Sequence, residues 1–141
     1  MNKIIKIILF FTLTYLFPVG SVAASEKIKI GLLVPLTGKD NEIGQSIVKS
    51  TRIAINKINN LSIEIIPKDT KSNPEVTLSA AKELASLGVK IVIGPVFNEN
   101  LIYLDDLTEI TFLSLTNKNN NFSTNIINAG INATSQLNAI K

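Results

Sequence analysis

Short apolar runs alternate with longer amphipathic stretches along this chain, and that alternation leaves few folds open. The apolar runs predict strands at 27–35, 63–67, 89–93 and 111–115. Continuous apolar runs of this kind are typical of strands buried on both faces of a parallel sheet. Helices are predicted between them at 42–59, 74–87 and 98–108, followed by a short extended piece at 125–129 and a helix from 133. The order and the short connections predict an α/β fold, a doubly wound parallel sheet with flanking helices.

The helix signals come from spacing and from capping residues. In the first helix, an inward-facing stripe at three- and four-residue spacing is predicted. It consists of Ile43, Ile47, Thr51, Ala54 and Ile58. The second helix has Asn73 as its N-cap, Pro74 at its first position and Gly88 as a left-handed cap. We expect it to bury Val76, Ala80, Leu84 and Leu87.

Residues 1–24 resemble an export signal in their layout. Lys3 and Lys6 form a basic start, an apolar run covers 7–19, and small residues lead to an expected cleavage after Ala24. The apolar run is shorter than the roughly 20 residues that a membrane-spanning helix needs. We therefore expect a cleaved signal peptide, a periplasmic protein at 25–141, and contact with the membrane only through the leader.

Composition excludes several classes of function. The chain has no Cys and no His, which excludes disulfides, Cys/His zinc sites and a Ser-His-Asp triad. Lys and Arg number 14 against 11 Asp and Glu, but Lys3 and Lys6 belong to the leader. The remaining near balance argues against a nucleic-acid partner. No dinucleotide or P-loop glycine motif occurs, and no nucleophile–base pair or paired acids are visible, so we expect no cofactor, no metal and no enzyme.

Two acidic features have structural explanations. Asp105, Asp106 and Glu109 form an acidic cluster that we expect to be a solvated helix face. Asp69 follows a predicted strand, where catalytic acids often lie, but no second acid or base is near in sequence. We expect it to fix a loop.

The candidate site follows from the predicted topology. Ligands of doubly wound sheets bind beyond the carboxyl ends of the strands. Those ends are the loops at 35–38, 69–70, 94–98 and 114–117, which are rich in hydroxyl, amide and glycine residues. Neighbouring helix N-termini offer free N–H groups to carboxylates or phosphates. The same residue types also make ordinary turns, and that alternative stays open.

Several segments, taken in order, resemble type I periplasmic binding proteins of the leucine/isoleucine/valine-binding kind. The opening strand and loop match at 30–38 (IGLLVPLTG), and the third strand and turn at 89–95 (VKIVIGP). The other matching positions are Gly44, Ala54, Ile58-Asn59, Asp69-Thr70, Asn73-Pro74, Ala80-Ala81, Leu84, Gly130 and Gln136. The resemblance implies two hinged lobes that clamp a small molecule, of which this chain supplies part of the first. Penicillin-binding protein activators, a second branch, are similar at 32–38, 93–97 and 115–117.

The resemblance implies an extracytoplasmic solute-binding domain for amino acids or similar small polar molecules. It would act in ABC-type uptake with a permease as partner. The alternative is an activator-like regulator of peptidoglycan synthesis, with a synthase as partner. A third outcome is a truncated inactive product. The helix predicted at 135–141 has no Gly or Pro stop, so we expect a fragment or a truncated gene product. The expected ligand contacts are Thr37, Gly38, Asn98, Ser114 and Thr116, with Phe97 as an apolar wall.

Overall fold

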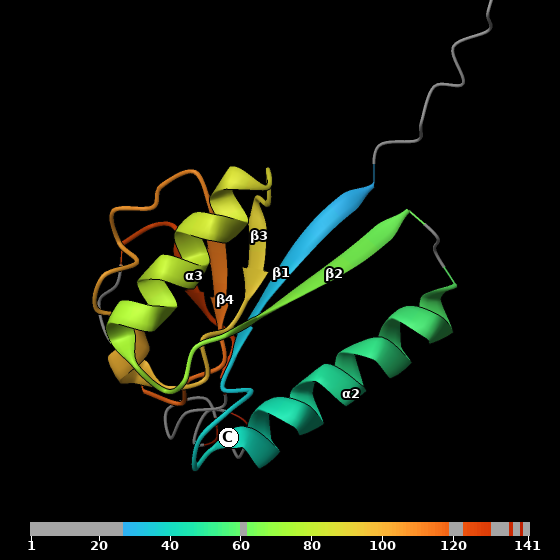
Figure 1. Cartoon of the computed structure of the whole chain (residues 1–141), viewed down its shortest axis with the longest axis horizontal. Helices are drawn as coiled ribbons and strands as arrows, with labels where there is room; N and C mark the ends of the chain where they lie inside the picture. The colour runs from blue at the N-terminus through green and yellow to red at the C-terminus, as the bar shows by residue number, and fades with distance from the viewer. Residues whose placement is uncertain (1–26, 60–61, 119–122, 131–135, 137–138, 140–141) are drawn as a thin grey trace, which may run out of the picture.

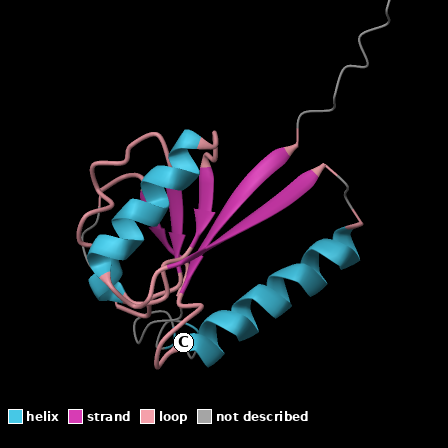
Figure 2. Ribbon diagram, viewed as in Figure 1, coloured by secondary structure: helices cyan, strands magenta, loops and turns pink. Residues whose placement is uncertain are grey.

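A single parallel sheet of five strands organises the chain (Figures 1 and 2). This computed structural model describes residues 27–59, 62–118, 123–130, 136 and 139. The strand order is β2-β1-β3-β4-β5, and every neighbouring pair is parallel. The strands are β1 (Ile28–Val34), β2 (Ile63–Asp69), β3 (Ile91–Ile93), β4 (Thr111–Ser114) and β5 (Ile126–Asn128). The predicted α/β fold is confirmed, while the leader and most of the helix expected from 133 lie outside the described residues.

Helices α2 (Asn41–Ile58) and α3 (Pro74–Ser86) cover opposite faces of the sheet (Figure 1). Along β1, Leu33 belongs to the larger apolar cluster, which includes Leu84 of α3. Leu32 and Val34 point the other way and pack with Val48 of α2. Because β1 is buried on both sides, its sequence is a continuous apolar run rather than an alternating one.

The beginning and end of α3 follow the predicted capping. The side-chain oxygen of Asn73 accepts a hydrogen bond from the Val76 N–H at 3.0 Å, and Pro74 opens the helix. Gly88, just beyond the helix end, has a φ of +79°. The predicted burial of Leu87 is wrong, because this residue lies in the turn after the helix and is exposed. Val76 is only partly buried, and the buried face of α3 consists of Thr77, Ala80, Ala81 and Leu84.

The predicted inward stripe of α2 is displaced around the helix. Ile43, Ala54 and Ile58 are exposed, whereas Gly44 and Val48 are buried. The cause is a close approach at the first turn, where a Cβ on Gly44 would lie 1.8 Å from the carbonyl oxygen of Pro35. That contact fixes the rotation of the helix, so Gly44 rather than Ile43 faces the sheet.

The predicted helix at 98–108 is wrong. A short 3-10 helix, η1 (Asn98–Leu101), is followed by successive turns in which an N–H donates to the carbonyl three residues back. The donors are Asn100, Leu104, Leu107 and Ile110, at 3.0 to 3.1 Å. The apolar residues are Leu101, Leu104, Leu107 and Ile110, all buried and spaced by three. A spacing of three matches the three residues per turn of 3-10 geometry and drifts around an α-helix.

Candidate functional site

The loop after β1 is tied to the end of β2 by the Asp69 carboxylate. One carboxylate oxygen accepts from the Leu36 N–H at 2.8 Å, from the Lys71 N–H at 2.9 Å and from the Thr37 N–H at 3.4 Å. The other oxygen accepts from the Thr37 hydroxyl at 2.6 Å. Burial acts to raise the pKa of Asp69, but hydrogen bonds from the Thr37 hydroxyl and the three N–H groups outweigh it and lower this pKa. The predicted loop-fixing role of Asp69 is confirmed.

The ends of β3 and β4 are joined by backbone hydrogen bonds. The Gly94 N–H donates to the Leu113 carbonyl at 2.8 Å, and the Leu115 N–H donates to the Pro95 carbonyl at 3.0 Å. Gly94 has a φ of +105°, and a Cβ there would lie 2.2 Å from the Leu33 carbonyl oxygen. Only glycine fits this position, which brings the exit of β3 against the end of β1.

The turn after β2 is held in an unusual backbone conformation. Lys71 and Ser72 both have positive φ values, 49° and 52°, which non-glycine residues rarely adopt. The Ser72 hydroxyl donates to the Asp40 carboxylate at 2.7 Å, and the Ser72 N–H lies 3.4 Å from the Thr70 hydroxyl oxygen. Strained residues of this kind persist where surrounding contacts determine them, often at functional sites.

These loops enclose a cavity of about 290 Å³ at the carboxyl edge of the sheet. Its lining residues come from the loops after β1, β2 and β3: Lys39, Asp40, Ser72, Phe97, Glu99 and Asn100. They combine one aromatic wall with charged, hydroxyl and amide groups. A concave site with an apolar wall and a few convergent polar groups is typical of small-molecule binding.

The predicted contact residues lie at this edge but take different parts in it. Phe97 lines the cavity, and Gly38 and Asn98 are chain neighbours of lining residues. Thr37 is exposed, and its hydroxyl donates to Asp69. Ser114, the last residue of β4, and Thr116, in the loop that follows, are buried.

Their hydroxyls serve the local turn. The Ser114 oxygen accepts from the Thr116 N–H at 3.3 Å, and the Thr116 oxygen accepts from the Lys118 N–H at 3.2 Å. Both fit the alternative that these residues shape a turn.

Sequence reasoning missed five of the six lining residues, among them Asp40, Ser72 and Asn100. Asp40 and Ser72 lie 32 positions apart, and the contact between them depends on how the two loops meet. Asn100 directly precedes the period-three apolar series, and this neighbourhood is the one local feature that sets it apart in the sequence. The predicted α-helix at 98–108 gave no reason to single it out.

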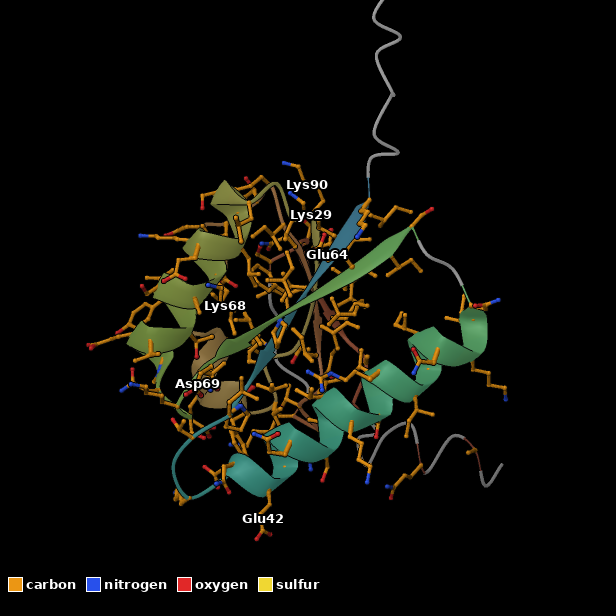
Figure 3. All side chains as sticks on the ribbon, turned by 45° about the vertical axis from the view of Figure 1, so that its right-hand side comes forward. Lys29, Glu42, Glu64, Lys68, Asp69 and Lys90 are labelled. Atoms are coloured by element: carbon orange, nitrogen blue, oxygen red, sulfur yellow. The ribbon has the colours of Figure 1, made fainter. Side chains whose placement is uncertain are left out.

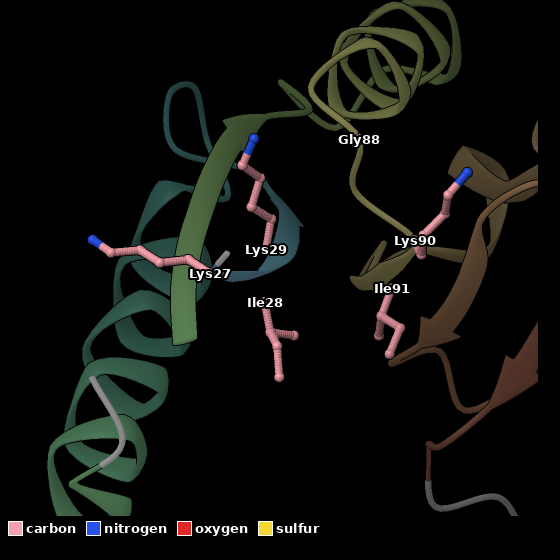
Figure 4. Close-up of a pocket in the computed structure, with 6 residues that line it drawn as sticks. All are labelled: Lys27, Ile28, Lys29, Gly88, Lys90 and Ile91. Atoms are coloured by element: carbon pink, nitrogen blue, oxygen red, sulfur yellow. The ribbon is translucent and has the colours of Figure 1, made fainter. Parts of the chain in front are cut away.

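A second cavity, of about 280 Å³, lies at the opposite end of the sheet, between the starts of β1 and β3 (Figure 4). Figure 3 shows Lys29 and Lys90 at that end and Asp69 at the other. In Figure 4, Ile28 and Ile91 face the opening, and the ammonium groups of its three lysines point away from it. The Lys29 ammonium donates to the Leu87 carbonyl at 2.9 Å. Because the cations do not converge, this cavity is a weaker candidate for an anionic ligand.

The remaining acidic groups do not gather into a site. Asp105, Asp106 and Glu109 are exposed, as expected for a solvated face. Within the described ranges, no group of three or more Asp, Glu, His or Cys residues is arranged to hold a metal ion. No helix in the described part of the chain has the length and apolarity needed to cross a membrane.

The fold and the cavity together define an open α/β domain with a candidate ligand site at the carboxyl edge of its sheet. The family model for periplasmic binding proteins matches residues 27–140. The chain therefore belongs to the periplasmic binding protein family. Membership indicates an extracytoplasmic location and confirms the family resemblance noted in the sequence.

Three solved structures illustrate the likeness. One is a solute-binding protein of an ABC transporter from Rhodopseudomonas palustris BisB5, in complex with 3,4-dihydroxybenzoic acid. It is 24% identical to this chain, with a TM-score of 0.60, and the match covers 64% of this chain and 27% of that protein. The leucine-binding protein LivK from Thermotoga maritima is 19% identical, with a TM-score of 0.59, and the match covers 64% of this chain and 28% of LivK. The C-domain of LpoA from Haemophilus influenzae, described as a regulator of PBP1A, is 24% identical, with a TM-score of 0.61. The match covers 73% of this chain and 32% of the LpoA domain.

At these identities, the structures show a shared fold. This chain spans between 27% and 32% of the length of the three proteins. No curated protein matches it.

Proposed function

We propose that this chain is an extracytoplasmic domain that binds a small polar solute, an amino acid or a similar carboxylate, for ABC-type uptake. One observation carries the proposal: the parallel order β2-β1-β3-β4-β5 brings the loops after β1, β2 and β3 to one cavity. Family membership supports solute binding as the general role. The expected contacts remain Thr37, Gly38, Phe97, Asn98, Ser114 and Thr116.

Binding at this edge would act through a change in population between conformations. A ligand that contacts one arrangement of the loops better than another shifts the equilibrium toward it. In a two-lobed binding protein, that arrangement is the closed one. An ABC permease that recognises the closed form would then be the partner.

The test is calorimetry and thermal unfolding of the full chain, recovered from the periplasm after expression with its leader. The panel contains leucine, isoleucine, valine, glutamate, benzoate and 4-hydroxybenzoate. A ligand at a hundred times its Kd stabilises the folded state by about 2.7 kcal/mol, which raises the unfolding temperature measurably. If no compound on the panel gives heat or a thermal shift, the proposal is contradicted.

The same preparation tests the export signal. We expect the mature protein to begin at Ser25, because small residues precede that position. N-terminal sequencing checks this directly. A protein that keeps residues 1–24 and stays with the membrane fraction would instead be anchored.

A second candidate is a regulator of peptidoglycan synthesis. The observation in its favour is coverage, since full-length LpoA from Haemophilus influenzae covers 83% of this chain with a TM-score of 0.62. Its partner would be a synthase rather than a permease. A pull-down from envelope extract distinguishes the two, because recovery of a synthase supports regulation and recovery of a permease supports uptake.

A further inference from the structure

Asn100 presents an unpaired carboxamide at the carboxyl-edge cavity. The residue lines this cavity and is only 1% exposed. Among the described residues, neither its Nδ2 nor its Oδ1 atom has a hydrogen-bond partner. Buried polar side chains are normally satisfied, so an amide with both atoms unpaired calls for an explanation.

The backbone of Asn100 is held in place. Its N–H donates to the Phe97 carbonyl at 3.1 Å within η1, and the next residue, Leu101, is fully buried. The amide therefore cannot reach solvent by a small shift of the loop. The cavity is the route by which water or a bound solute reaches it.

The other lining groups narrow the chemistry of that partner. Glu99 forms an ion pair with Lys118 at 3.1 Å, so its charge is already balanced. Lys39 has no ion-pair partner in the described ranges, and the Asp40 carboxylate accepts one hydrogen bond from Ser72. The site thus offers a cation, a carboxylate and a neutral amide beside the Phe97 ring.

We infer that this cavity binds a solute with an amide group between two opposite charges, that is, a short peptide, with the Asn100 carboxamide as its anchor. A carboxamide has a donor and an acceptor side by side, which match the C=O and N–H of another amide. The ammonium group of the ligand would face Asp40, and the carboxylate of the ligand would face Lys39. A free amino acid has both charges but no neutral amide, so it cannot pair with both sides of the Asn100 carboxamide while its charged groups face Asp40 and Lys39. The inference rests on the proposed function and specifies its ligand.

The test compares glycyl-leucine with leucine by calorimetry on the full chain. We expect glycyl-leucine to bind at least tenfold more tightly than leucine. The variant Asn100→Leu should weaken glycyl-leucine binding at least tenfold while its unfolding temperature stays level or rises. Leucine has a similar volume, and replacing an unpaired amide by an apolar group removes a desolvation penalty. The matched control is Asn56→Leu, an exposed position near the far end of α2, which should leave binding unchanged.

A measurement on the unmodified chain covers the case that the Asn100 variant does not fold. The Asn100 side-chain amide protons should shift in a ¹H–¹⁵N NMR titration with glycyl-leucine. Equal binding of glycyl-leucine and leucine, an unaffected Asn100→Leu variant, or unmoved Asn100 amide protons would each overturn this inference and leave solute binding intact. Failure of both compounds and of the earlier panel would overturn the proposed function as well.

Discussion

Asp69 is the residue on which the geometry of the carboxyl edge most depends. Its two oxygens accept four hydrogen bonds, from the loop after β1 and from the turn that follows β2. Each of those donors would otherwise need water or another acceptor. The side chain therefore fixes the relative positions of two of the three loops that enclose the cavity.

Replacing Asp69 by Asn should lower the free energy of unfolding by about 1–2 kcal/mol. The amide keeps one oxygen acceptor, but its NH₂ group cannot accept the hydrogen bond that the Thr37 hydroxyl donates at 2.6 Å. Urea denaturation measures the change. Asp106→Asn is the matched control, since Asp106 is exposed, and it should change stability by less than about 0.5 kcal/mol. Equal effects of the two substitutions would contradict this role of Asp69.

The lowered pKa of Asp69 also predicts how stability depends on pH. The folded pKa lies below the ordinary value of 3.8, so the folded state favours the carboxylate. The resulting stability is complete above that ordinary value and is lost as the pH falls through the folded pKa. Urea denaturation between pH 7 and pH 3 should therefore show a steeper acid loss for the unmodified chain than for Asp69→Asn. Parallel curves would show that Asp69 is not the group responsible.

Gly44→Ala should destabilise the chain by about 1–3 kcal/mol, even though alanine is the better helix former. The added Cβ would lie 1.8 Å from the Pro35 carbonyl oxygen, and two backbone segments would have to separate. Thermal unfolding measures the loss. Ser46→Ala, at an exposed position of the same helix, should be neutral or slightly stabilising. A stabilised Gly44→Ala variant would mean that α2 does not pack this closely.

Sequence reasoning at the scale of single residues succeeded where the cause was local. Asn73, Pro74 and Gly88 could be assigned because capping depends on a few neighbouring residues. The unpaired amide of Asn100 could not be predicted, because it depends on the packing of segments that are distant in sequence. The rotation of α2 was missed for the same reason, since it depends on Pro35.

Among the elements, the segment from Leu101 to Ile110 shows how spacing can mislead. An α-helix is predicted here from the sequence, but apolar residues that recur strictly every three positions belong to 3-10 geometry. The buried side chain of Asn125 supports these turns, because its amide donates to the carbonyls of Leu104 and Leu107 at 3.3 and 3.0 Å. Asn125, just before β5, thus stabilises turns that the sequence of the 101–110 segment alone does not determine.

Leu104→Ala should cost about 2–5 kcal/mol of unfolding free energy, because Leu104 is fully buried in the larger apolar cluster. Ile102→Ala should cost less than about 0.5 kcal/mol, since Ile102 is 66% exposed. Chemical denaturation of both variants makes the comparison. A larger loss for Ile102→Ala would indicate that the segment presents a different face to the sheet.

On the scale of the whole molecule, the alternation of strands and helices was enough to predict a parallel sheet. It was enough because β1 is covered by α2 on one face and α3 on the other, which leaves a continuous apolar run in the sequence. The same reasoning located the carboxyl edge and its loops. It could not show which loop residues enclose the cavity, because the contact between Asp40 and Ser72 exists only in the folded chain.

Under the proposed function, solutes bind where the loops after β1, β2 and β3 meet. A ¹H–¹⁵N NMR titration with the solutes named above tests it residue by residue. Shift changes should gather at 36–40, 69–72 and 96–100. Changes confined to Lys27, Lys29 and Lys90 at the opposite end of the sheet, or no changes at all, would contradict it.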